Sequence, residues 1–338
     1  MTRSHSRRAV TYKTWLNLRW WLLLTLLFLW MGWLSPWLTM DNPTIFLRGR
    51  LDQLAAGGAQ GYQIDWTLLW MVALGALPMA LERSRGALLT TLAGPVRRRD
   101  LYNLQCACCL AIVWLGLALL AGYIAWLNAS LGGPLTIAHI LGWLGRQLLS
   151  HTAALMVGLA AGTIIGNYGM AVFCGIGVAG VPIYASLVWS FMVNLRIQHE
   201  LQAHPHAATG PDVQALAAKT EAILRLSPLV PADGVHGPLW TGLVLWFVLW
   251  SAGWYALGLW LFERLPLERE GNVFSYPVCW HLLFAAIGLM AGFMVTVMSW
   301  RGAQPPVWQA FLLWSVASGA IWLLLALARR IAVARRQE

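Results

Sequence analysis

The sequence predicts an all-α membrane protein, a polytopic bundle of about eight transmembrane helices with both termini in the cytoplasm. Hydrophobic residues make up 59% of the 338 residues and charged residues only 11%, whereas a soluble domain carries about 25% charged residues. The apolar residues form runs of roughly 20, the length that crosses a bilayer. Many of the 22 tryptophans lie at the ends of these runs, where indoles favour the headgroup layer.

The chain begins with an arm, residues 1–19, that is rich in lysine and arginine and contains no acidic residue. These basic residues alternate with apolar residues at roughly helical spacing. The pattern predicts a short amphipathic helix on the inner leaflet, attracted to anionic membrane lipids. The apolar run 20–38 follows. It is too long for a secretory signal and lacks a small-x-small cleavage site, so we expect it to remain as an anchor.

Seven further apolar runs follow the anchor, separated by polar segments. Residues 39–65 and 195–238 are expected to be external loops, the second with a short helix over 211–226. Gly158 and Gly162 belong to a four-residue glycine spacing that favours close helix packing in lipid, with a gating hinge as the alternative. The expected spans are 20–38, 66–81, 103–127, 149–166, 170–193, 240–262, 280–299 and 307–327.

The distribution of basic residues predicts the orientation. Under a topology with eight spans and an internal N-terminus, 16 of the 23 lysines and arginines lie in the arm, the 82–102 loop, the 263–278 loop and the C-terminal tail. Cytoplasmic loops carry the excess of lysine and arginine. An even number of spans also returns the basic tail to the cytoplasm.

The sequence contains no familiar catalytic motif. It has no Gly-x-x-x-x-Gly-Lys-Ser/Thr phosphate loop, no Gly-x-Ser-x-Gly elbow and no His-Glu-x-x-His helix. Cys106, Cys108 and Cys109 cluster without a nearby His or carboxylate, which favours apolar packing over a metal site. We therefore predict no catalytic residue, no metal and no cofactor. The exposed basic domain that nucleic-acid binding needs is also missing.

An intramembrane enzyme, or a membrane sensor or structural component, is the alternative class. Such an enzyme would need polar side chains that converge at one depth of the bilayer. The sequence offers His151, Asn167, Tyr168 and Tyr184, which form no recognised triad or metal site. A lone His in a span is more often a hydrogen-bonded packing residue, although ionisable groups near the midplane are typical of ion-coupled transporters.

The most informative segment runs from Glu82 to Asp100, directly after the second predicted span. Leu88, Leu89 and Leu92 can share one helix face, which predicts a short amphipathic helix near the cytoplasmic surface. The pair Gly94-Pro95 stops this helix. Three arginines then precede the third span.

This segment resembles the coupling segment of ABC-2-type permeases. In that family the second span ends in Glu, followed by a basic residue, a Gly, a Leu-rich turn and Pro-Val-x-Arg, and the segment docks into a groove on an ATPase subunit. The resemblance, together with the charged Arg85, implies that the ATPase-coupling residues are Glu82, Arg83, Arg85, Gly86, Leu88, Leu89, Leu92, Pro95 and Arg98.

The resemblance implies a permease subunit of an ATP-binding-cassette transporter in the bacterial cytoplasmic membrane. It would pair with a second permease copy or paralogue and with cytoplasmic ATPase subunits that hydrolyse the ATP. The substrate and the direction of transport stay open. The amphipathic arm is likewise similar to the elbow helix of the family.

Residues 262–274 are similar to the loop after the sixth span in Gram-positive permeases with extra C-terminal spans, of the acetoin-utilisation type. Six spans are usual in the family, so eight is a departure. The predicted organisation is an arm at 1–19, a permease core of six spans at 20–262, and a C-terminal part at 263–338 with a charged loop, two further spans and a basic tail.

Overall fold

The described part of the protein is built from α-helices. The computed structural model describes residues 3–56, 65–84, 86, 97–203, 211–230, 238–265, 273–299 and 306–334. These residues contain no strand, and the isolated bridge between Ile165 and Phe274 is their one β-type pairing. The all-α prediction is confirmed.

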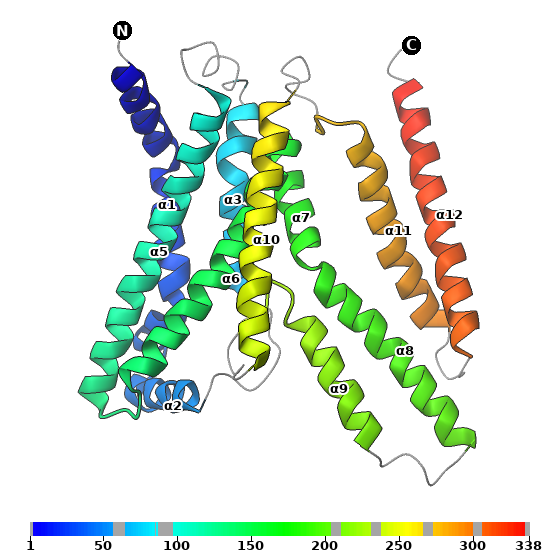
Figure 1. Ribbon diagram of the computed structural model, residues 1–338, viewed down its shortest axis with the longest axis horizontal. Helices are drawn as coiled ribbons and strands as arrows, with labels where there is room; N and C mark the ends of the chain where they lie inside the picture. Colours follow the sequence, from blue (N-terminus) through cyan, green and yellow to red (C-terminus); the bar gives the residue numbers. More distant parts are fainter. Residues whose placement is uncertain are drawn as a thin grey trace. The chain divides into compact units, whose positions relative to one another are not determined.

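The helices (Figure 1) are α1 (Arg3–Thr39), α2 (Pro43–Ala55), α3 (Trp66–Ser84), α5 (Arg98–Leu131), α6 (Ile137–Ile164), α7 (Tyr168–Ala179), α8 (Val181–Ala203), α9 (Pro211–Leu224), α10 (Pro238–Glu263), α11 (Val278–Ser299) and α12 (Val307–Ala334).

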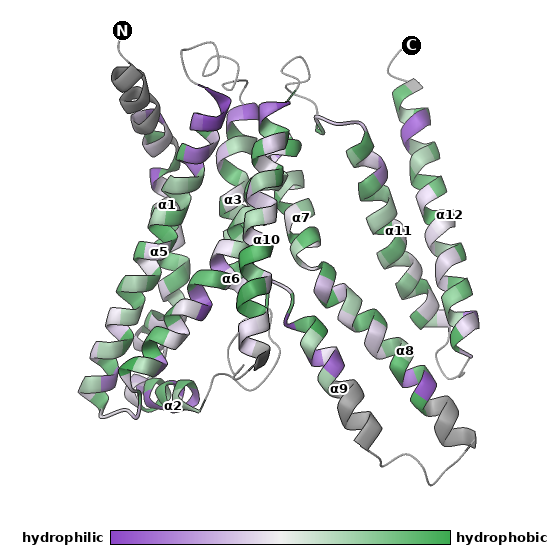
Figure 2. Ribbon diagram, viewed as in Figure 1, coloured by the Kyte–Doolittle hydropathy of each residue, from purple (hydrophilic) through white to green (hydrophobic). Residues whose placement is uncertain are grey.

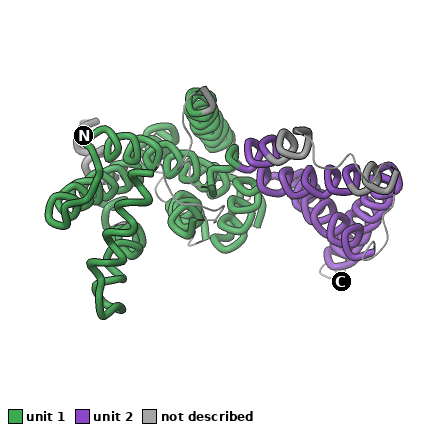
Figure 3. The backbone as a smooth tube through the Cα atoms, turned by 90° about the horizontal axis from the view of Figure 1, so that it is seen from below, with its two compact units in different colours: residues 1–180, 225–275 green, residues 181–224, 276–338 purple. Residues whose placement is uncertain are grey.

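The chain divides into two compact units (Figure 3). Unit 1 comprises residues 1–180 and 225–275, and therefore contains α1, α2, α3, α5, α6, α7 and α10. Unit 2 comprises residues 181–224 and 276–338, with α8, α9, α11 and α12.

Six of the described helices are long and apolar enough to cross a membrane: α1 from Leu18 onward, α5, α6, α10, α11 and α12. The number is seven if α7 and α8 together form one broken span. Helix α3 is not among them, because Glu82 and Arg83 lie in its last turn, but most of its residues are buried inside unit 1. A multi-pass membrane protein is therefore indicated, while the total of eight spans and the orientation stay predictions.

The N-terminal arm differs from our expectation. We expected a separate helix at 1–19 before the span at 20–38, but α1 runs without a break from Arg3 to Thr39. The reason lies in the sequence, which has no Gly or Pro between Arg3 and Gly32 to interrupt the helix.

The fifth predicted span, 170–193, is divided into α7 and α8. The division falls at Gly180, next to Pro182, whose missing backbone N–H and bulky ring disfavour a continuous helix. The expected external loop at 39–65 also contains the unpredicted helix α2, which begins at Pro43. Proline is well suited to the first position of a helix.

The centre of unit 1 is the packing of α3 against α6. The backbones approach so closely that a Cβ added to Gly75 would lie 2.8 Å from the backbone N of Leu159. A Cβ on Gly158 would lie 2.8 Å from the carbonyl carbon of Val72. Gly162 makes a similar approach, so the predicted role of small residues in close packing is confirmed at this contact.

Unit 2 uses the same principle at the contact between α11 and α12. A Cβ on Gly288 or Gly292 would lie 2.7 Å from backbone atoms of Ser318. From α8, the hydroxyl of Tyr184 donates a hydrogen bond of 2.6 Å to the carbonyl of Leu289. Among the described residues, α12 has exposed apolar side chains that include Val316, Leu323, Leu324 and Leu327.

Candidate functional site

Hydrophilic residues gather at the end of unit 1 where α3 finishes and α5 begins (Figure 2). The ammonium of Lys13 on α1 lies 4.0 Å from Oε1 of Glu82 on α3. Arg98, at the start of α5, donates from Nη1 to the carbonyls of Glu263 (2.9 Å) and Leu265 (2.8 Å) at the end of α10. The ends of α1, α3, α5 and α10 therefore meet here, and we call this region the polar end of unit 1.

Glu82 and Arg83 are buried at the polar end. Their exposed fractions are only 5% and 2%. Nη1 of Arg83 donates to the carbonyl of Thr163 on α6, at 3.0 Å. We expected these two charged residues to fix the register of a partner, and the structure places them inside unit 1, where Arg83 connects α3 to α6. The predicted coupling segment therefore begins on a helix that is packed against α6 and hydrogen-bonded to it.

Gly86 ends α3. Its φ of +64° is in the left-handed region, and its N–H donates to the carbonyl of Arg83 at 3.0 Å. Glycine adopts this conformation without a Cβ penalty. Four of the predicted coupling residues, Glu82, Arg83, Gly86 and Arg98, thus lie at the two ends of the segment. The other five lie outside the described residues: Arg85, Leu88, Leu89, Leu92 and Pro95.

A second polar cluster surrounds His151 in α6. Nδ1 of His151 lies 2.8 Å from the carbonyl oxygen of Gln147, one turn earlier in the helix. Nε2 lies 3.1 Å from Oγ1 of Thr67, near the start of α3. Oγ1 of Thr67 is also 2.8 Å from Oδ1 of Asp65, which accepts a second hydrogen bond from the Thr67 backbone N–H at 2.8 Å.

Arg50 on α2 contributes positive charge close to this cluster. Its guanidinium donates to the carbonyl of Gly32 and lies over the rings of Trp33 and Phe46, at 5.2 and 5.6 Å from their centroids. Burial lowers the pKa of Arg50, and the negative charge of Asp65 acts in the opposite direction. The protonated guanidinium therefore offsets part of the negative charge of Asp65.

Sequence reasoning singled out His151 but missed its side-chain partner Thr67 and also Asp65, which contacts Thr67. The sequence signal that could have found them is the Asp-x-Thr pattern directly before an apolar run, which is typical of a helix start. The other members of the proposed enzyme set do not join His151. Asn167 caps α7 by accepting from the N–H of Met170, Tyr168 packs near Trp21, and Tyr184 belongs to unit 2.

The cysteines lie within helices. Cys106 and Cys109 are buried in α5, and Sγ of Cys106 is 3.9 Å from the sulfur of Met156. The described residues hold no group of three or more His, Cys, Asp or Glu side chains placed to bind a metal ion.

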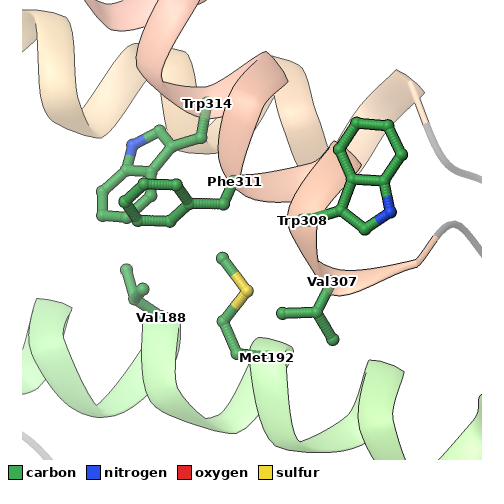
Figure 4. Close-up of a pocket in the computed structure, with 6 residues that line it drawn as sticks. All are labelled: Val188, Met192, Val307, Trp308, Phe311 and Trp314. Carbon is green, nitrogen blue, oxygen red and sulfur yellow. The ribbon is translucent and has the colours of Figure 1, made fainter.

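Unit 2 contains an apolar pocket of about 640 Å³ between α8 and α12 (Figure 4). Val188 and Met192 point from α8 toward α12, where Val307 and Phe311 lie opposite them. None of them carries a charge, so the pocket suits an apolar molecule such as a lipid acyl chain. It is lined by Val188, Met192, Val307, Trp308, Phe311 and Trp314.

Comparison of the chain with known protein families, characterised proteins and solved structures finds no match.

Proposed function

We propose that this chain is the membrane-spanning permease subunit of an ATP-binding-cassette transporter in a bacterial cytoplasmic membrane. Separate cytoplasmic ATPase subunits supply the energy, and a second permease copy or paralogue completes the pathway. The chain itself catalyses no covalent chemistry. The sequence pattern of segment 82–98 is the starting point for this proposal, and the arrangement of the polar end of unit 1 supports it.

The observation that carries the proposal is that both ends of the coupling segment lie at the polar end of unit 1. Glu82 contacts Lys13, while Arg98 bonds to the end of α10. Basic residues are concentrated in the chain segments that meet there. By the positive-inside rule this end faces the cytoplasm, which is the side on which an ATPase would dock.

The packing of α3 gives such docking a mechanical consequence. Helix α3 carries the start of the coupling segment, and its backbone touches α6 at Gly75 and Gly158. Packed interfaces of this kind do not deform continuously, so a displaced helix moves its neighbour or repacks. A force applied by the ATPase to the segment would therefore act on the α3–α6 pair, and Arg83 would transmit it through its bond to Thr163.

The experiment is purification of the chain from native membranes, with any ATPase that co-purifies identified by mass spectrometry. Leu88→Asp or Leu89→Asp would place a charge in the apolar groove of the ATPase. Burying an unpaired charge costs several kcal/mol, enough for the complex to dissociate during purification. Val213→Asp, an equivalent change in the predicted external loop, is the matched control and is expected to leave the complex intact.

Membrane insertion of each variant is measured in parallel, because a variant that fails to insert gives no information on docking. If both leucine variants insert and still recover a full amount of ATPase, segment 82–100 is not the docking site. If the unchanged chain recovers no ATPase from native membranes, the transporter proposal itself is wrong.

A further inference from the structure

A chain of three hydrogen-bond contacts links Asp65, Thr67, His151 and the carbonyl of Gln147. The first contact joins Oδ1 of Asp65 to Oγ1 of Thr67 (2.8 Å) and the second joins Oγ1 to Nε2 of His151 (3.1 Å). The third joins Nδ1 to the Gln147 carbonyl (2.8 Å). All three distances are ordinary hydrogen-bond lengths.

These three contacts need three protons. A carbonyl only accepts, so Nδ1 of His151 must carry a proton for the contact with Gln147. A threonine hydroxyl supplies one proton and can therefore donate to Asp65 or to Nε2, but not to both. With an ionised Asp65 and a neutral His151 the chain holds two protons, and one contact is left without a hydrogen bond. With one additional proton, each of the three contacts has a hydrogen bond.

The additional proton belongs on Nε2 of His151. Oδ1 of Asp65 accepts from both the backbone N–H and the hydroxyl of Thr67. With Thr67 donating to Asp65, its oxygen is free to accept from an Nε2–H. We propose that Asp65, Thr67 and His151 form a proton-binding site inside the membrane-spanning bundle, in which His151 takes up one proton from water and becomes an imidazolium.

The position of the site suits proton exchange between one bilayer surface and the interior. His151 lies about 18 Å along α6 from Thr163 at the polar end, at 1.5 Å per residue over 12 residues, on a helix that is long and apolar enough to cross a hydrocarbon layer of about 30 Å. The imidazole is buried, with an exposed fraction of 1%, whereas Asp65 and Thr67 are half-buried. A proton would therefore reach His151 by way of Asp65 and Thr67, from the end opposite to the polar end.

The charged groups around the site come from few elements. Asp65 precedes α3, and Arg50 on α2 acts on Asp65 through its charge. Arg146 on α6 lies close to the site in sequence, and its guanidinium is over the ring of Trp240 at 5.9 Å.

Helix α10 presents the apolar Phe247 and its neighbouring tryptophans beside this part of α6. From α5, the indole of Trp114 donates to Thr152. Among these described residues His151 is the imidazole, which can carry a proton on one ring nitrogen or on both.

Proton binding at this site would strengthen the contact between α3 and α6, because Thr67 and His151 lie on these two helices. Loss of the proton would weaken the same contact. The proposal does not depend on an ATPase partner, and its test uses the isolated chain. A failure of ATPase docking and a failure of proton binding are therefore separate results.

The test is nitrogen NMR of the full-length chain in lipid nanodiscs, with ¹⁵N-labelled histidine, between about pH 5 and 8. The chain has 8 histidines, and the signal of His151 is the one missing from His151→Gln. If that variant fails to fold, a chain in which the other seven are replaced by glutamine isolates the same signal. We expect both ring nitrogens of His151 to be protonated at low pH, with loss of the Nε2 proton as the pH rises.

Substitutions of Thr67 distinguish an imidazolium that is stabilised by its hydrogen bond to Thr67 from a His151 that is only buried. Thr67→Ser keeps the hydroxyl and should preserve the imidazolium signal. Thr67→Val keeps the shape but removes the bridge to Asp65, so His151 should be the neutral Nδ1–H form throughout. The proposal is overturned if His151 is neutral at every pH in the unchanged chain, or if Thr67→Val shows the same imidazolium signal as Thr67→Ser.

Discussion

The close contact between α3 and α6 makes a sharp prediction for Gly158→Ala. An added Cβ at this position would lie against the carbonyl oxygen of Val72, 2.8 Å from its carbonyl carbon and 3.0 Å from the backbone N of Ala76. All three atoms are backbone, so no side chain can rotate away. The two helices would have to separate. Gly145, on the same helix, has no atom within 4 Å of an added Cβ, so Gly145→Ala is the matched control.

The magnitude follows from these distances. Ordinary van der Waals contact begins at 3.4 Å, so the contact with the Val72 carbonyl carbon alone requires a shift of about 0.6 Å. Overpacking of this kind costs about 1–3 kcal/mol. Alanine also favours a helix over glycine by about 1 kcal/mol, and this gain applies to both variants. The difference in unfolding free energy between Gly158→Ala and Gly145→Ala therefore isolates the clash, at about 1–3 kcal/mol.

A thermal melt with a thiol-reactive fluorogenic dye measures this difference. Cys106 and Cys109 are buried and become reactive when unit 1 opens. At about 2–4 °C per kcal/mol for a domain of this size, Gly158→Ala should melt about 2–12 °C below Gly145→Ala. Equal melting temperatures for the two variants would refute the close contact between α3 and α6.

Three further predictions test the topology, the chemistry and the polar end. Reporter fusions at residue 338 and within 195–238 should report opposite sides of the membrane, and the same side for both would exclude eight spans. The purified chain alone should not hydrolyse ATP, which a phosphate-release assay on a preparation free of ATPase can check. Arg83→Met removes a charged donor from the carbonyl of Thr163 and should lower the unfolding free energy by about 1.5–3 kcal/mol. Arg330→Met, at an exposed position, should leave the melting temperature nearly unchanged.

Much of the fold was predictable because the bilayer imposes a simple rule on the sequence. Each predicted apolar run is helical, although the run 170–193 is divided between α7 and α8, since a chain in lipid must satisfy its backbone polar groups internally. Helix α2 was missed because the surrounding segment 39–65 is polar and Gly-rich, and because the burial of Leu47 and Leu51 depends on tertiary packing. The periodicity of apolar residues predicts single helices, and it does not reveal which other helices will pack against them.

The candidate sites were less predictable because they depend on contacts between distant residues. Thr67 and His151 are 84 positions apart, and neither lies in a motif that names the other. Arg83 was predicted to be an ATPase-coupling residue at the end of a span. It is buried because the carbonyl of Thr163, 80 positions away, accepts its hydrogen bond. An arginine near a span end can thus be a structural residue whenever a neighbouring helix ends at the same level.

The low apolarity of α3 has a consequence for the biosynthesis of the protein. The translocon releases a segment into lipid according to its own hydrophobicity, and α3, ending in Glu82 and Arg83, falls short of the spans around it. Its main packing partner, α6, is synthesised later. A ribosome stalled between α5 and α6 should therefore leave α3 poorly inserted, and insertion should be completed only when α6 emerges. In this chain, insertion of α3 into the bilayer would therefore depend on tertiary packing against α6.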